Sequence, residues 1–394
     1  MSEISIIDKM PARFSYGEHE TKAINSVLEY YKTKNEDPGY QGYFEEKFCN
    51  NFAQFMGGGY CDAVASGTAS IYTALAALEL PKGSDVLISP VTDSGPLNCI
   101  ILLGYTPVAI DSKKNSYNID LEQFKKRITS NTSALLLVHT GGEPVEQTEL
   151  IVQEAHKRGI KVLEDCSQAT GATINGKKVG SFGDIAAFST MYRKNLIAGS
   201  SGGLIYTKNK DLYHLALAHA DRGKQTWRTD INQNDPSHAL FPALNLNTDE
   251  ISCAIGVSSL NRLQETIDKR VSFLEYFIPL LSKNSKVCSA YTFNKGFSPF
   301  FFPIFVDDTQ LSCTKVEFAK KLAEHGVSNN SEYGCVITQW QWAKEYFNDT
   351  FEARNALELK DASFNLFLNE NYTEKEANNI IKVLVELEKL YLVG

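Results

Sequence analysis

The stretch IKVLEDCSQATGATINGKKVGSFGDIAAFSTMYRKNLIAGSSGGLIYT, residues 160–207, decides the fold class of this chain. Three short apolar runs lie in it, at residues 160–165, 184–189 and 202–207. Each has the length and the aliphatic or β-branched composition of a strand, and turn-forming residues separate them. Continuous apolar runs of this kind are typical of strands covered on both faces, as in a parallel sheet.

The same pattern extends toward the N-terminus. Apolar runs recur at residues 85–90, 106–111 and 133–139, and they alternate with amphipathic stretches. Of these stretches, TASIYTALAALEL (68–80) follows a turn, and ELIVQEAHKRG (149–159) ends in basic residues and a glycine, as helices commonly do. The alternation predicts an α/β fold with a mostly parallel sheet.

Beyond about residue 250 the pattern changes. Helical periodicity dominates residues 250–281, and the remainder mixes a strand-like run at 297–306 with helix-like segments at 314–326 and 373–392. The last of these begins with a Thr-x-x-Glu capping box. Because 394 residues exceed what one core supports, we expect two domains. The large domain with an N-terminal arm spans 1–255, and a smaller α+β domain spans 256–394.

Composition excludes several classes of function. A net charge of -8 argues against a nucleic-acid surface, and no apolar run is long enough to span a bilayer. Residues 1–20 lack a basic segment followed by an apolar one, so we expect no secretory signal and a cytoplasmic location. The eight cysteines show no metal-ligand spacing, which predicts buried free thiols and no metal site. The expected partner is a small molecule.

Three segments carry candidate chemistry. Ser66-Gly67-Thr68 stands directly before a predicted helix, where backbone amides and the helix dipole would favour an anion, although the same tripeptide is a common helix cap. Asp165 ends an apolar strand, at the edge where open α/β sheets bind ligands. Such a carboxylate can keep a ring nitrogen protonated, as pyridoxal chemistry requires, or it can cap the next turn. Lys194 lies in the loop after a strand, where most lysines are simply solvated.

The order of these three segments, with Lys194 29 positions after Asp165, is similar to that of the DegT/StrS-type sugar aminotransferases, a branch of the fold-type I pyridoxal-phosphate enzymes. The resemblance also covers residues 42–70, 103–120, 138–146, 160–189 and 373–384. It implies an aspartate-aminotransferase-like fold, with a mostly parallel seven-stranded sheet and a smaller C-terminal domain. It also implies a homodimer with active sites shared between subunits.

The resemblance assigns roles to individual residues. Lys194 would be the Schiff-base lysine, Asp165 the partner of the pyridine nitrogen, and Gln168 a neighbour of the cofactor's O3′ or ring face. The phosphate would be bound by Gly67, Thr68 and Ser189 of one subunit and by Asn245 of the other.

Some positions depart from the family pattern. Asp93 stands where most members carry an aromatic ring that stacks on the cofactor, so it would either bind substrate hydroxyls or hydrogen-bond the following turn. Arg193 replaces a small hydroxyl residue, and Asn247 replaces a residue that is usually basic. These changes indicate a different sugar.

The implied reaction moves an amino group from glutamate to a sugar carbonyl. Within the family, the resemblance is nearest to members that aminate C8 of 8-oxo-3-deoxy-manno-octulosonate, giving 8-amino-3,8-dideoxy-manno-octulosonate for lipopolysaccharide. Candidate ligands of the substrate carboxylate, or else solvated surface charges, are Arg193, Arg222, Lys224 and Arg228.

Three alternatives remain open. A nucleotide-linked keto-hexose could be the acceptor. A related dehydratase would typically have His in place of Lys194. A non-catalytic sensor could keep the fold for binding alone.

Overall fold

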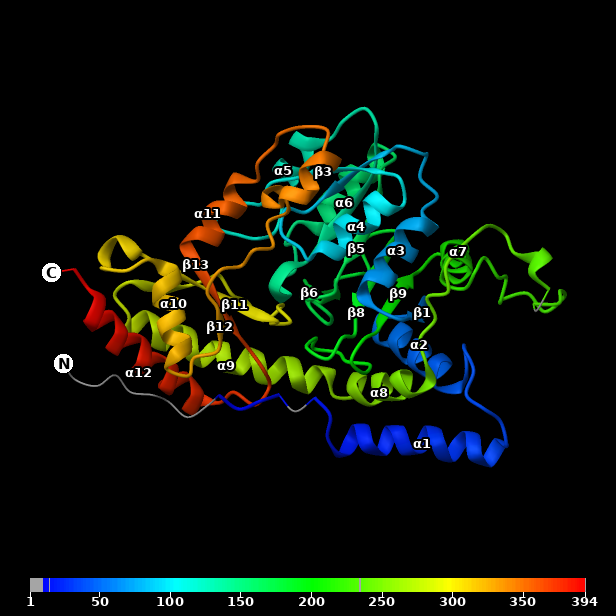
Figure 1. Ribbon diagram of the computed structural model, residues 1–394, viewed down its shortest axis with the longest axis horizontal. Coiled ribbons are helices and arrows are strands. Elements are labelled where there is room, and N and C mark those ends of the chain that lie inside the picture. Colours follow the sequence, from blue (N-terminus) through cyan, green and yellow to red (C-terminus); the bar gives the residue numbers. More distant parts are fainter. Residues whose placement is uncertain (1–9, 14, 234, 394) are drawn as a thin grey trace.

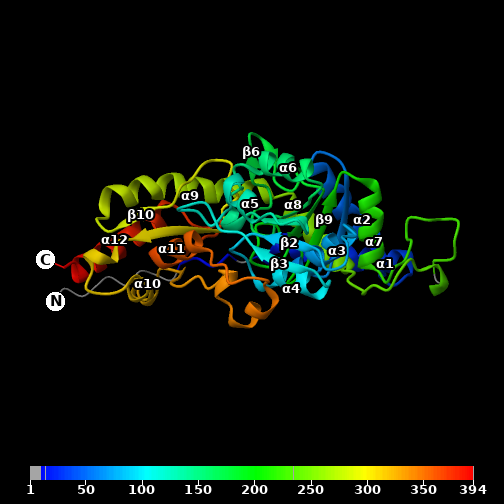
Figure 2. The same ribbon diagram turned by 90° about the horizontal axis from the view of Figure 1, so that it is seen from above.

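The computed structural model describes residues 10–13, 15–233 and 235–393, and it shows two units, each built on a sheet of its own (Figures 1 and 2). Residues 1–9, which belong to the segment examined for a secretory signal, lie outside the described residues. No helix among the described residues is both long and apolar enough to cross a membrane.

The described residues of the larger unit form a seven-stranded sheet in the order β1-β9-β8-β5-β4-β2-β3. Strand β9 runs opposite to the other six strands of this sheet, so the expected mostly parallel sheet is confirmed. The strands are β1 (Tyr60–Val64), β2 (Asp85–Ile88), β3 (Thr106–Ala109), β4 (Thr132–Val138), β5 (Lys161–Asp165), β8 (Ile185–Ser189) and β9 (Gly203–Thr207).

Helices cover both faces of this sheet. They are α2 (Tyr43–Phe55), α3 (Gly67–Ala77), α4 (Ser94–Leu102), α5 (Leu121–Arg127), α6 (Thr148–Lys157), α7 (Lys210–Ala220) and α8 (Glu250–Leu260), and α1 (Glu18–Lys34) packs on α8 (Figure 1). Alternate residues of a strand face opposite sides. Leu135 and Leu137 of β4 accordingly pack with the α5 and α6 side chains, whereas Leu136 packs with those of α3 and α4. This double burial explains why the strands are continuous apolar runs.

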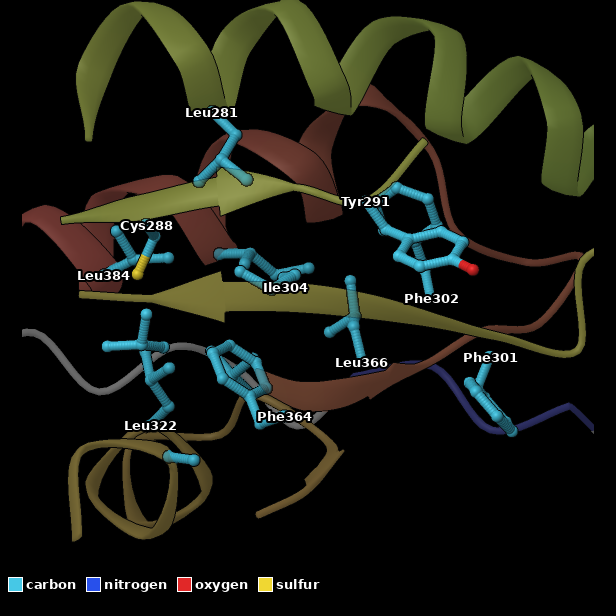
Figure 3. Close-up of a cluster of buried hydrophobic side chains, with 14 of the residues drawn as sticks. Leu281, Cys288, Tyr291, Phe301, Phe302, Ile304, Leu322, Phe364, Leu366 and Leu384 are labelled. Atoms are coloured by element: carbon cyan, nitrogen blue, oxygen red, sulfur yellow. The ribbon is translucent and has the colours of Figure 1, made fainter. Parts of the chain in front are cut away.

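The smaller unit is built on a second sheet with the order β10-β11-β13-β12. Its elements are α9 (Leu263–Asn284), β10 (Cys288–Ala290), β11 (Phe301–Val306), α10 (Lys315–Glu324), β12 (Asn329–Asn330), α11 (Arg354–Ala362), β13 (Ser363–Phe367) and α12 (Glu374–Tyr391). Side chains of α9, α10 and α12 pack around this sheet, including Leu281, Leu322 and Leu384 next to Ile304 and Phe364 (Figure 3).

Two segments connect the units in ways that the sequence pattern did not indicate. Ile337 and Ala343 follow the smaller unit's β12 in sequence, yet they pack in the core between the large sheet and α3 and α4. Val91 and Val336 form an isolated antiparallel bridge, with hydrogen bonds from Thr92 N to Cys335 O (3.0 Å) and from Ile337 N to Pro90 O (3.0 Å). The division at residues 255 and 256 stays a prediction.

Several local predictions can be compared with the structure. The helix expected over 250–281 is two helices, because Asn261 and Arg262 interrupt it between α8 and α9. Thr373 caps α12 with Glu376 in the expected capping box. All eight cysteines are free, and six of them are buried.

Candidate functional site

An open helix N-terminus forms one wall of the site. Ser66 caps α3, and its Oγ accepts a hydrogen bond from Ala69 N (3.0 Å). The first N–H groups of a helix have no partner within the helix, so those of Gly67 and Thr68 are available to an anion. A Cβ on Gly67 would come within 2.9 Å of the Ser189 hydroxyl, which explains the glycine. The structure thus shows Ser66 as a cap, and the capped helix leaves N–H groups at its start that could bind an anion, which we call the cradle.

A carboxylate lies at the carboxyl end of β5, the strand between β4 and β8. Asp165 is only 3% exposed, and its Oδ1 accepts a hydrogen bond from Ser167 N (2.9 Å). Burial raises the pKa of this carboxyl, while the hydrogen bonds from Ser167 and the charge of Lys194 oppose the rise. A group that is buried and yet hydrogen-bonded as an anion is suited to hold a proton on a nearby base.

Lys194 approaches the same place from the loop after β8. Its N–H closes a turn on Met191 O (2.8 Å), and its Nζ lies 4.6 Å from the centre of the Phe300 ring. Burial lowers the pKa of its amine, against the opposing charges of Asp165 and Asp93. A desolvated amine loses its proton more easily and becomes a nucleophile that can form an imine with a carbonyl.

The smaller unit contributes to the site through residues that sequence reasoning missed. Tyr333 hydrogen-bonds Gln168, whose Oε1 accepts a hydrogen bond from Gly141 N (2.7 Å). Burial raises the pKa of the Cys335 thiol, which also lies close enough to Asp93 and Lys194 for their charges to shift that pKa, Asp93 upward and Lys194 downward. Phe300 precedes β11, inside an apolar run that shows only strand character in the sequence.

Asp93 has a definite structural task. It caps α4, and its Oδ1 accepts a hydrogen bond from Gly95 N (3.1 Å). The structure thus shows the turn contact that was one of its two expected roles. Gly95 in turn lies against Thr68, whose Oγ1 would be 2.7 Å from a Cβ on that glycine. Asp93 is exposed and close enough to Lys194 for their charges to interact.

The structure therefore brings most of the predicted residues to one edge of the sheet. The residues that meet there are Gly67, Thr68, Asp93, Asp165, Gln168, Ser189 and Lys194. Their chemistry fits a phosphorylated aromatic aldehyde. The helix N-terminus suits the phosphate, the buried carboxylate suits a ring nitrogen, and the desolvated amine suits the aldehyde.

The predicted cationic side chains make other contacts in this chain. Arg193 is exposed and lies beside the ring of Tyr192. Arg222 and Lys224 pair with Asp221, and Arg228 pairs with Asp230. The last three belong to the segment between α7 and α8, which extends away from the body of the molecule in Figure 1.

Asn245 is exposed on the same segment, next to the Tyr40 hydroxyl (3.4 Å). Asn247 donates a side-chain hydrogen bond to Asn245 Oδ1 (2.8 Å) and forms a backbone bridge with Val64. None of these contacts brings Asn245 to the cradle of its own chain within the described residues.

Comparison with known proteins gives a consistent assignment. The model of the DegT/DnrJ/EryC1/StrS aminotransferase family matches residues 18–385. The chain is 31% identical over 234 residues to GDP-perosamine synthase of Escherichia coli O157:H7, a match that covers 58% of this chain and 61% of that protein. It is 32% identical over 281 residues to dTDP-3-amino-3,6-dideoxy-alpha-D-galactopyranose transaminase of Aneurinibacillus thermoaerophilus, covering 70% and 71%.

Solved structures share the fold over nearly the whole chain. An aminotransferase from Psychrobacter cryohalolentis superposes with a TM-score of 0.88 at 23% identity, covering 97% of this chain and 99% of that one. Helicobacter pylori PseC, an aminotransferase involved in the biosynthesis of pseudoaminic acid, superposes with a TM-score of 0.85 at 21% identity, covering 98% and 100%. These likenesses confirm the expected fold.

Proposed function

Because the chain belongs to the DegT/DnrJ/EryC1/StrS aminotransferase family, we propose that Lys194 binds pyridoxal phosphate as a Schiff base and that a sugar carbonyl accepts the amino group. Membership of this family makes the protein a pyridoxal-phosphate-dependent aminotransferase. One observation carries the proposal, namely the meeting of Lys194, Asp165 and the open N-terminus of α3 at one sheet edge.

Each residue has a role that its surroundings support. The N–H groups of Gly67 and Thr68 bind the phosphate together with the Ser189 hydroxyl. Asp165 holds the proton on the pyridine nitrogen, which its burial and its hydrogen bond to Ser167 equip it to do. Gln168, which is held by hydrogen bonds with Gly141 and Tyr333, would contact the bound cofactor.

Bound pyridoxal phosphate supplies the electron sink that stabilises negative charge at the substrate carbon. With the cofactor bound, Lys194 Nζ would act as the base that takes the proton from the donor's Cα and as the acid that delivers it to the cofactor. The same amine returns a proton to the sugar carbon in the second half-reaction. We propose glutamate as donor, and the two half-reactions should follow ping-pong kinetics.

For the acceptor we propose 8-oxo-3-deoxy-manno-octulosonate, which would give the 8-amino sugar of lipopolysaccharide. The free sugar acid lacks a nucleotide, and Asp93, the turn residue where the family pattern has a stacking ring, is consistent with a changed acceptor site. The segment between α7 and α8 carries Arg222, Lys224 and Arg228, which offer guanidinium and ammonium groups for a carboxylate in the site of a second subunit.

The test is the absorbance of the purified protein reconstituted with pyridoxal phosphate. Glutamate should convert the cofactor to its amine form, and 8-oxo-3-deoxy-manno-octulosonate should regenerate the original band. Lys194→Ala should abolish both conversions, with Lys177→Ala, an exposed lysine of β7 (Lys177–Lys178), as the control. Failure of glutamate to react, while other amino acids succeed, would identify a different donor.

A nucleotide-linked keto-hexose is the second candidate acceptor. It is favoured by the relatives, whose names describe products linked to GDP and dTDP. Regeneration of the band by such a sugar, and not by the octulosonate, would keep the transaminase and replace the acceptor.

The alternative from a different functional class is a sensor that binds a ligand and has no catalytic activity. A cell that carries only the Lys194→Ala protein distinguishes it, because a sensor would retain its cellular role in that cell. We expect the role to be lost.

A further inference from the structure

The loop that carries Lys194 is bound from behind by a side chain of the N-terminal arm. The Arg13 guanidinium donates hydrogen bonds to three carbonyl oxygens of the loop backbone, at Tyr192 O (3.1 Å), Lys194 O and Asn195 O (3.2 Å). Its Nε also donates to Glu370 Oε1 (2.9 Å). Arginine suits this task because its planar fork presents several donors in fixed directions.

A second arginine extends the network into the smaller unit. Arg270 of α9 is 1% exposed, and its Nη2 donates to the other oxygen of Glu370 (2.9 Å). Its Nη1 donates to Asn195 Oδ1 (2.5 Å) and to Pro299 O (3.0 Å). The Asn195 amide donates to Ser298 Oγ (2.7 Å). The residue directly after Lys194 is thus held through both its backbone and its side chain.

Such a network of buried charges stabilises a fold poorly. Burying charges costs solvation energy that an apolar cluster of the same volume would not cost. Its distinguishing property is geometric, because every bond ends on the loop or on a residue that holds the loop. The network touches the backbone of Lys194 and the side chain of Asn195, whereas the Lys194 side chain extends to Phe300 and toward Asp165.

We propose that Arg13, Glu370, Arg270 and Asn195 form a positioning network that fixes the direction of the Lys194 side chain. Since Glu370 and Arg270 lie on segments of the smaller unit and Arg13 on the N-terminal arm, the network also ties the lysine to the arrangement of the two units. The inference rests on the proposed role of Lys194.

Arg13→Ala is the variant of choice, because it removes the bonds to the loop and leaves Glu370 and Arg270 as a neutral pair. A misplaced reacting group slows the chemical step more than it weakens binding. We therefore expect kcat to fall at least about tenfold while KM stays within about twofold. The pH midpoint of the cofactor's visible absorbance band should shift, and Arg13→Lys should restore part of kcat.

Arg262→Ala is the matched control. Arg262 lines the same cavity as Arg13, but it donates to Ser258 O and pairs with Glu20, which belong to α8 and α1. The Arg262→Ala variant should leave kcat and the pH midpoint of the absorbance band at the wild-type values. If Arg13→Ala does not fold, Arg13→Lys is measured against Arg262→Lys with the same expected directions.

Borohydride reduction followed by peptide mapping separates this inference from the proposed function. Label on Lys194 in every variant, with the expected fall in kcat and shifted midpoint, supports the network. Label on Lys194 with wild-type kcat and midpoint, and only a lower Tm, would make the network purely structural and overturn the inference. Label on another lysine would refute both the site and the network.

Discussion

Glu164, the neighbour of Asp165 on β5, faces the other side of the sheet and has a different purpose. It is fully buried, and it accepts hydrogen bonds from three backbone N–H groups of residues 180–183 and lies 3.2 Å from His139 Nε2. The other ring nitrogen of His139 accepts from Val145 N (3.0 Å). Together with Cys166 these residues are close enough to ligate a metal, but both imidazole nitrogens already have protein partners. We interpret the group as structural.

Glu164→Gln should therefore destabilise the fold without changing the reaction that the protein catalyses. Burial raises the pKa of this carboxyl, but the hydrogen bonds from His139 and the backbone lower it by more than burial raises it. The net pKa therefore lies below its usual value. Such a group stabilises the fold at pH values above its unfolded pKa, and the contribution is lost as pH falls through the lower folded pKa. We expect a loss of about 3 kcal/mol at neutral pH.

Denaturant unfolding at several pH values measures this loss. The difference between wild type and Glu164→Gln should narrow in acid, whereas the exposed Glu149→Gln should match wild type throughout. A constant difference at all pH values would mean that packing, and not charge, is responsible.

Glu143 behaves in the opposite sense. Burial raises its pKa to about 7, against the hydrogen bonds from Tyr291 and Ser116. A raised carboxyl pKa stabilises the fold most below the unfolded value, and this contribution is lost as pH rises through about 7. Wild type should lose up to about 3 kcal/mol of unfolding free energy between acid and mildly alkaline pH. Glu143→Gln should flatten that slope, and an unchanged slope would place the titrating group elsewhere.

At the scale of elements, two helix caps stabilise their helices equally, but only one of them lies at the candidate site. Ser66 caps α3 at the cradle, whereas Thr314 caps α10 in the smaller unit, and each accepts a backbone hydrogen bond. Removing a cap costs about 1 kcal/mol in either helix. Only the loss at α3 should also disturb an anion site.

The expected result is that Ser66→Ala and Thr314→Ala lower the free energy of unfolding of the apoprotein by similar amounts, about 1 kcal/mol. Of the two variants, only Ser66→Ala should also bind pyridoxal phosphate more weakly than wild type, and equilibrium titration measures this affinity. Equal affinities in the two variants would contradict the assignment of the cradle.

The elements themselves were largely predictable because their signals are local. Apolar runs predicted β2, β3, β4, β5, β8 and β9, and a capping box predicted the start of α12. β1 was missed because YCDAV is short and contains Asp62. The break between α8 and α9 was missed because apolar periodicity continues through Asn261 and Arg262.

At the scale of the whole molecule, the segment between α7 and α8 is the part that the single chain leaves without an obvious task. It extends from the body (Figure 2), and both Leu240 and Leu244 on it are exposed. A second copy of the chain, as the family resemblance implies, would give the segment a surface to bind and would bring Asn245 to a neighbouring phosphate site.

Mixing two inactive variants tests this arrangement. Lys194→Ala lacks the amine, and we expect Asn245→Ala to lack a phosphate ligand supplied to its partner. If sites are shared, unfolding and refolding the two together should restore activity, because some mixed dimers contain one intact site. Refolding Lys194→Ala with Asp165→Ala provides the contrast, since both residues belong to the same chain's half of a site. Equal recovery in the two mixtures would contradict a shared site.

The site was predictable only as far as its residues lie in ordered local motifs. Gly67 begins a recognisable helix, Asp165 ends a recognisable strand and Lys194 follows another, and their order along the chain indicated a shared site. Tyr333 and Phe300 come from the second unit, and Arg13 contacts a carboxylate 357 positions away. No local pattern reports such contacts, because tertiary packing alone creates them.

The short bridge between Val91 and Val336 limits how this protein can be rebuilt. Its two sides belong to different halves of the chain, and the residues after it insert their side chains beneath the helices of the other half. Grafting residues 256–394 from a relative would therefore exchange part of the candidate site and part of the large core at once. We therefore expect that a change of acceptor sugar made by such a graft would need matching changes in both halves of the chain.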